Sequence, residues 1–85
     1  MNRKKRIERK LIENFEGWEI IVNDVSVNHA GHNNFDGKNE THFSLLLTNP
    51  KNIKFNKLSI HRKIYNLLNK EFTDGLHSLE IKFRD

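Results

Sequence analysis

The first third of the chain carries apolar residues at helical spacing. Ile7, Leu11, Ile12 and Phe15 recur every three or four positions in "RKKRIERKLIENF", and charged residues occupy the positions between them. This pattern predicts an amphipathic helix over residues 3–15. Gly17 follows directly and offers a stop signal for the helix.

Two segments then show the alternation typical of strands. Residues 18–27 are rich in aromatic and β-branched types, and in residues 41–48 Phe43, Leu45 and Leu47 alternate with His42, Ser44 and Leu46. We expect the two strands to pair as a hairpin. About a dozen residues separate them, whereas ordinary hairpin loops have two to five, and a longer loop in a compact domain is usually functional or disordered.

A second helix and a last strand complete the pattern. Pro50 ends the second strand, a helix is predicted over residues 57–72, and "TDG" closes it before a strand over residues 76–83. The helix–strand–strand–helix–strand order predicts an α+β fold, with a three-stranded sheet and its helices packed on one face. The stripe expected to face the core from the second helix comprises Leu58, His61, Ile64, Tyr65, Leu68 and Phe72.

Composition limits the possible functions. Eighty-five residues with 35% apolar content predict one domain spanning residues 1–85, too small for a deep enclosed active site. The chain has no cysteine, and it contains no apolar run long enough to span a membrane and no signal-peptide core, which makes the cytoplasm the expected location. No nucleophile motif, zinc-protease motif or phosphate loop occurs, so we expect a protein that is not an enzyme.

A basic balance invites a nucleic-acid interpretation. The net charge is +4, with cations concentrated in the first ten residues. Asparagine, lysine and isoleucine are all abundant, however, so composition alone gives the charge little functional weight. We expect the cationic first helix to be mainly a solvated helix face.

Histidine supplies the strongest candidates for chemistry. His29 and His32 lie three residues apart in the long polar loop, where imidazoles can ligate a metal, although such a pair is more often solvated. His77 opens the last strand on the parity of its apolar residues. His42 and His61 are expected to have structural or supporting roles.

Several strings together resemble the BolA family. "IERKLIENF", "VNDVSVNHAGH", "ETHFSLLL", "IHRKIYNLLNKEF" and "GLHSLEIK" occur in family order across nearly the whole chain. The resemblance implies a fold like the class II KH domain. It also implies a monothiol glutaredoxin partner of the Cys-Gly-Phe-Ser type, with which the protein would hold a bridging [2Fe-2S] cluster together with glutathione. His77 matches the family's usual cluster ligand, and His29, with His32 as a nearby substitute, matches the loop ligand.

The resemblance suggests an adaptor in iron–sulfur cluster trafficking or iron sensing, which alone would be a monomer or weak homodimer without a cofactor. The alternative is a DNA-binding transcriptional regulator. Where relatives often carry a glycine loop resembling that of KH domains, this chain has Asn52 and Lys54 in "NIKF", which weakens that interpretation. A zinc site made only of histidines ranks below both. The residues that would approach DNA are Lys57, Arg62, Lys63 and Lys70.

Overall fold

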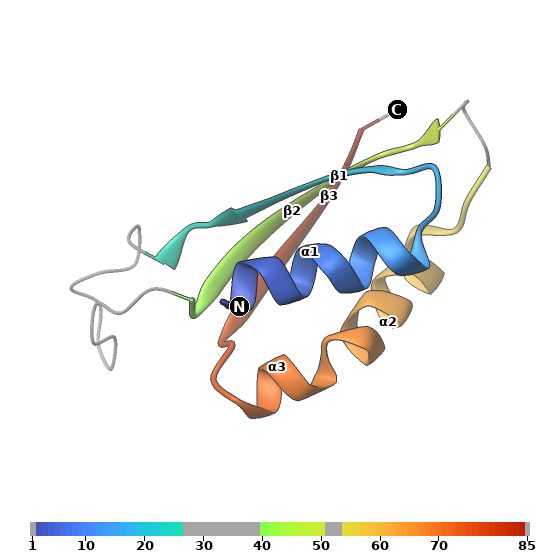
Figure 1. The fold of residues 1–85 in the computed structure, drawn as a ribbon. Coiled ribbons are helices and arrows are strands. Elements are labelled where there is room, and N and C mark those ends of the chain that lie inside the picture. The colour runs from blue at the N-terminus through green and yellow to red at the C-terminus, as the bar shows by residue number, and fades with distance from the viewer. Residues whose placement is uncertain (1, 27–39, 51–53, 85) are drawn as a thin grey trace.

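The computed structural model describes residues 2–26, 40–50 and 54–84 (Figure 1). Its elements follow the predicted order, except that the second helix is divided into two. The elements are α1 (Arg3–Asn14), β1 (Glu19–Asp24), β2 (His42–Thr48), α2 (Lys57–Leu67), α3 (Asn69–Thr73) and β3 (Ser78–Arg84).

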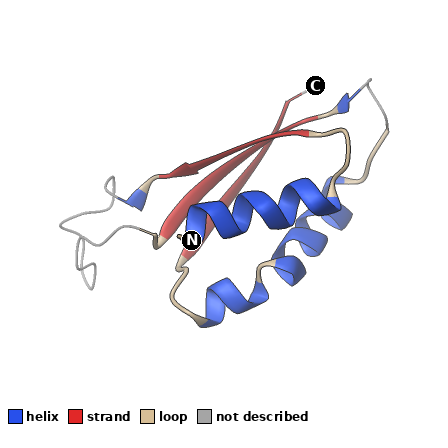
Figure 2. Ribbon diagram, in the orientation of Figure 1, coloured by secondary structure: helices blue, strands red, loops and turns tan. Residues whose placement is uncertain are grey.

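The three strands form one mixed sheet in the order β1-β2-β3. β1 and β2 pair antiparallel from Glu19 opposite Thr48 to Asp24 opposite Phe43, which confirms the predicted hairpin pairing. β2 and β3 pair parallel, because the chain crosses over through α2 and α3 between them. All three helices cover the same face of the sheet (Figures 1 and 2), as the α+β prediction required.

The core lies between the helices and that face of the sheet. Alternate residues of each strand point into it, and α1 contributes Ile7, Leu11 and Phe15. The prediction was wrong for Ile12, which is 62% exposed, because a helical step of one residue turns it away from the buried side. The core side chains on the strands and later helices are Val22, Phe43, Leu45, Leu47, Ile64, Leu68, Leu76 and Leu79.

The predicted helix over residues 57–72 is interrupted at Leu68. Asn56 caps the start of α2 by accepting a hydrogen bond from the Ser59 N–H, as Asn2 caps α1. Leu68 leaves helical geometry with φ −100° and ψ 12°, yet its side chain is fully buried. The segment contains no glycine or proline, so no helix-breaking residue explains the interruption. The interruption coincides with the packing of Leu68 into the core.

Two members of the predicted core stripe of this helix face solvent instead. Leu58 is 57% exposed, and His61 is also exposed with its ring edge-on to Tyr65 at a centroid distance of 4.9 Å. Both lie in the first turns of α2, where Ile60 is the residue that packs against the core. None of the described helices is long and apolar enough to cross a membrane.

Candidate functional site

Two histidines meet at one end of the sheet. His42 begins β2, and its register partner on β3 is Ser78, the residue after His77. The imidazole rings of His42 and His77 therefore approach edge to face, with centroids 5.8 Å apart and an interplanar angle of 78°. The His77 N–H donates to the Thr41 carbonyl at 2.7 Å, while the His77 residue remains exposed.

His42 is oriented by its neighbours. Its Nδ1 lies 2.9 Å from the Thr41 hydroxyl, and its backbone N–H donates to Ser26 Oγ at 3.0 Å. A hydrogen bond on one ring nitrogen fixes the orientation of an imidazole and favours one tautomer. The predicted supporting role of His42 stays a prediction, but its position beside His77 gives that role a physical route.

The loop histidines, His29 and His32, lie outside the described residues. What the structure describes are the two ends from which that segment leaves and returns, at Ser26 and Glu40. Within residues 2–26, 40–50 and 54–84, no three His, Cys, Asp or Glu side chains come together in a group that could hold a metal ion. A metal at His77 would therefore need ligands from beyond these residues.

A hydrogen-bonded clamp joins the two ends of this segment. Asp24 Oδ1 accepts from the Ser26 hydroxyl at 2.6 Å and from the Ser26 N–H at 2.9 Å, and its Oδ2 accepts from the Glu40 N–H at 3.0 Å. Ser26 is fully buried, and its Oγ also accepts from the Thr41 N–H at 2.9 Å. Short polar side chains that bond nearby backbone favour such turns.

The clamp also sets the charge state of Asp24. Burial would raise the pKa of the Asp24 carboxyl, but the hydrogen bonds from Ser26 and the Glu40 N–H, together with the charge of Lys4, outweigh it and lower the pKa. Asp24 is therefore held as a carboxylate that accepts on both oxygens.

Arg3 connects this clamp to the last helix. Its backbone N–H donates to Glu40 Oε1 at 2.7 Å, and its guanidinium donates to the Glu40 carbonyl, to Glu71 Oε1 at 3.0 Å and to the Asp74 carbonyl at 3.0 Å. The Arg3 side chain is only 11% exposed. The expectation that the cationic helix is simply a solvated face is therefore wrong for Arg3, because tertiary contacts draw it inward.

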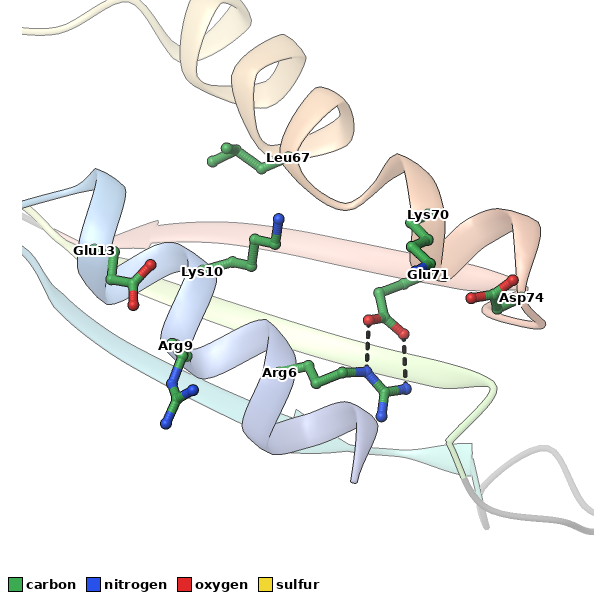
Figure 3. A pocket seen from close by; sticks show the side chains of 8 residues that line it. All are labelled: Arg6, Arg9, Lys10, Glu13, Leu67, Lys70, Glu71 and Asp74. Atoms are coloured by element: carbon green, nitrogen blue, oxygen red, sulfur yellow. Dashed lines mark hydrogen bonds and ion pairs between the residues drawn. The ribbon is translucent and has the colours of Figure 1, made fainter. Parts of the chain in front are cut away.

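Arg6 completes the ion pairs around Glu71. Figure 3 shows its guanidinium on α1 facing the Glu71 carboxylate on α3, with Nε to Oε2 at 2.7 Å and Nη2 to Oε1 at 3.0 Å. The hydrogen bond from Arg6 lowers the pKa of Glu71 against the opposing effect of burial, with a further contribution from Arg3. The same contact raises the pKa of Arg6.

The predicted DNA-contacting residues have different surroundings. Lys57 Nζ lies 5.8 Å from the centre of the Phe83 ring, and Lys63 Nζ lies 4.9 Å from that of Phe15. Arg62 is exposed on α2. Lys70 borders a groove of about 650 Å³ between α1 and the end of α2 with α3, which is lined by both basic and acidic side chains (Figure 3). The residues lining this groove are Arg6, Arg9, Lys10, Glu13, Leu67, Lys70, Glu71 and Asp74.

Sequence reasoning singled out His77 but missed the residues that fix its surroundings. An Asp and a Ser two residues apart, just before a long loop, form a signal that could have indicated the Asp24–Ser26 clamp. No local pattern could have indicated the partners of Arg3, because Glu40, Glu71 and Asp74 are 37, 68 and 71 residues away in the chain.

The amino-acid sequence is similar to those of known proteins. The family profile described as BolA-like protein matches residues 11–84. Chloroplastic protein BOLA1 of Arabidopsis thaliana is 38% identical over 82 residues, which cover 94% of this chain and 51% of that protein. The UV-induced protein uvi31 of Schizosaccharomyces pombe is 36% identical over 84 residues, covering 95% of this chain and 82% of that one. The chain thus spans about half the length of the Arabidopsis relative.

Solved structures agree. The BolA domain of SufE1 from Arabidopsis thaliana aligns with 99% of this chain and 92% of its own, at a TM-score of 0.78 and 37% identity. BolA1 from the same plant aligns over the same shares of the two chains, at a TM-score of 0.77 and 36% identity. The similarity therefore includes the described sheet, the helices that cover it and the sheet end that carries His77.

Proposed function

The chain belongs to the BolA-like protein family, and on that basis we propose that it is a non-enzymatic adaptor that binds a monothiol glutaredoxin and shares a bridging [2Fe-2S] cluster with it. His77 is the proposed ligand from the sheet end, and His29 or His32 is the proposed ligand from the loop. The cluster is cargo held between two proteins, and its delivery or sensing is the proposed role.

The position of His77 is the observation that carries this proposal. The residue is exposed at the end of the sheet, while its backbone N–H is fixed by the hydrogen bond to Thr41. A ligand to a shared cluster needs both properties, because it must reach a partner and still keep one orientation. In this proposal, His42 beside His77 and the clamp at Asp24 have supporting roles.

The donor chemistry fits shared ligation. The chain has no cysteine, so the thiolates that hold most iron–sulfur clusters must come from elsewhere. In the proposal they come from the glutaredoxin cysteine and from glutathione. Imidazole in place of thiolate raises the reduction potential of a cluster and makes ligation sensitive to protonation. The mixed complex should therefore differ spectroscopically from a glutaredoxin homodimer.

To test the proposal, this protein is added stepwise to a cluster-loaded monothiol glutaredoxin in the presence of glutathione. We expect the visible absorption and circular dichroism of the cluster to change, and we expect His77→Ala to remove most of the change. His61→Ala is the matched control, because His61 is exposed on α2 away from the candidate site. Separate His29→Ala and His32→Ala proteins would identify the loop ligand.

Two results would reject the proposal. One is a cluster spectrum that the wild-type protein leaves unaltered. The other is a His77→Ala protein that changes the spectrum as fully as the wild type does. The DNA-binding alternative stays a prediction that no described contact favours: Lys57 and Lys63 lie near aromatic rings, and the groove beside Lys70 mixes basic with acidic side chains.

A further inference from the structure

The backbone of His77 is held where two segments of the chain meet. Thr41 accepts the His77 N–H at 2.7 Å and the Ser78 N–H at 3.1 Å through its carbonyl. Glu40 precedes Thr41 on one segment, and the turn that begins at Asp74 precedes His77 on the other. Whatever holds Glu40 and Asp74 together therefore also fixes the meeting point at His77.

Arg3 holds both segments. Its guanidinium donates to the carbonyls of Glu40 and Asp74 and, through Nε, to Glu71 Oε1. A planar guanidinium can donate in several fixed directions at once, which a lysine ammonium on a flexible stem cannot reproduce. Hydrogen bonds from a charged donor are also stronger than those between neutral groups.

Gly75 lies beside the Arg3 guanidinium. Its φ is +128°, a conformation that favours glycine, and a Cβ built there would lie 3.4 Å from Arg3 Nη2, in van der Waals contact. The turn before β3 therefore packs against the guanidinium. The Arg3 side chain is 11% exposed, whereas that of Arg6 is 41% exposed, and of the Arg3 hydrogen bonds the one to the Asp74 carbonyl lies at the surface.

We infer that Arg3 is a positioning residue for His77: it ties the turn from Asp74 to the end of the loop at Glu40, and so fixes where the imidazole is presented. The functional part of this inference rests on the proposed cluster ligation. The positioning part concerns the isolated protein and can be tested without any cluster.

The first test is amide hydrogen exchange in the isolated protein, followed by NMR. Arg3→Lys keeps the positive charge but removes the planar guanidinium that donates to three acceptors at once. We expect exchange of the His77 amide to rise about tenfold more than that of Leu45 in the core, because a local opening near His77 would no longer be opposed by charge-assisted hydrogen bonds. Ring-to-ring NOEs between His42 and His77 should weaken in parallel.

Arg6→Lys is the matched control. Arg6 donates two hydrogen bonds to the same Glu71 carboxylate, and its charge, which also acts on Glu40 and Asp74, is kept in the lysine variant. It should therefore lower overall stability while leaving His77 exchange in step with the core. If Arg3→Lys behaves like Arg6→Lys, with His77 and Leu45 rising equally, the positioning inference is overturned.

The second test uses the mixed complex with a cluster-loaded glutaredoxin. Arg3→Lys should still form the cluster-free heterodimer with unchanged affinity but should give a smaller change in cluster circular dichroism. If Arg3→Lys gives a circular dichroism change as large as that of the wild type, the link between positioning and ligation is overturned. If the wild-type protein itself leaves the cluster spectrum unchanged, the proposed function fails, and the exchange comparison still decides whether Arg3 positions His77.

Discussion

The His42 and His77 rings are in edge-to-face contact, with centroids 5.8 Å apart, although 34 residues lie between them in the chain. The contact arises because β2 and β3 run parallel, so the starts of both strands lie at the same end of the sheet. His42 lies beside His77, the candidate ligand, and the carbonyl of Thr41 accepts a hydrogen bond from the His77 backbone N–H.

His42→Ala tests the supporting role. In a titration followed by circular dichroism, the midpoint should shift to about tenfold higher protein concentration. A loss of this size in affinity is typical when a residue that supports a ligand is removed. His77→Ala should remove most of the cluster-dependent circular dichroism change. The measurement is a spectroscopic titration of cluster-loaded glutaredoxin with each variant. If His42→Ala abolishes the signal as completely as His77→Ala does, His42 is itself a ligand.

Ser26→Ala tests the clamp between the ends of the long segment. Its fully buried Oγ accepts hydrogen bonds from the N–H groups of Thr41 and His42. Removing it should lower the free energy of unfolding by about 1–3 kcal/mol, since buried donors lose their acceptor. Urea denaturation would measure the change. Ser44→Ala, which removes only an exposed contact with Glu80, should stay within about 0.5 kcal/mol of wild type.

Acid should destabilise the protein through Asp24 and Glu71. The folded state lowers the pKa of both carboxyls, so their contribution to stability is complete above the unfolded-state pKa values, near 4, and is lost as pH falls through the folded values. Unfolding free energies measured by urea denaturation from pH 7 to about 3 should therefore fall. Asp24→Asn and Glu71→Gln should each be less stable at pH 7 and depend less on pH. A pH dependence equal to that of wild type would contradict the assignment.

Gly75→Ala tests the turn before β3. At φ +128° a side chain is strained, and the added Cβ would meet the Arg3 guanidinium at 3.4 Å. We expect a loss of about 1–3 kcal/mol in unfolding free energy, the range for a residue held in an unfavourable backbone region. Thermal or urea unfolding would measure it. Gly17→Ala is a useful comparison, because its φ is +86° but the nearest atoms to its Cβ, in Pro50, lie at 3.8 Å.

Periodicity was enough to predict the element order, because a helix or strand that buries one face must repeat its apolar residues at 3.6 or 2 positions. Ile7 and Leu11 on α1 and the alternation of Phe43, Leu45 and Leu47 on β2 illustrate this. The break at Leu68 could not be predicted in the same way. Leu68 fits the helical pattern and is fully buried, and only its packing in three dimensions distinguishes it from a helix interior.

The candidate site was only partly predictable for a related reason. His77 could be named from its motif, and Ser26 had a local turn signal. Arg3 had neither, since a cation in the run "NRKKR" resembles its solvated neighbours until Glu71 is brought close by the crossover. Contacts between residues far apart in sequence depend on strand order and register, which periodicity does not specify.

The parallel pairing of β2 with β3 also has a consequence for folding. The β1–β2 hairpin is local in sequence, but β3 can join it only after the chain has closed a loop through α2 and α3, and contacts across such separations form at a greater entropic cost. Until β3 has paired with β2, a folding chain cannot place His77 beside His42. The pair of rings is therefore assembled only in the completed domain.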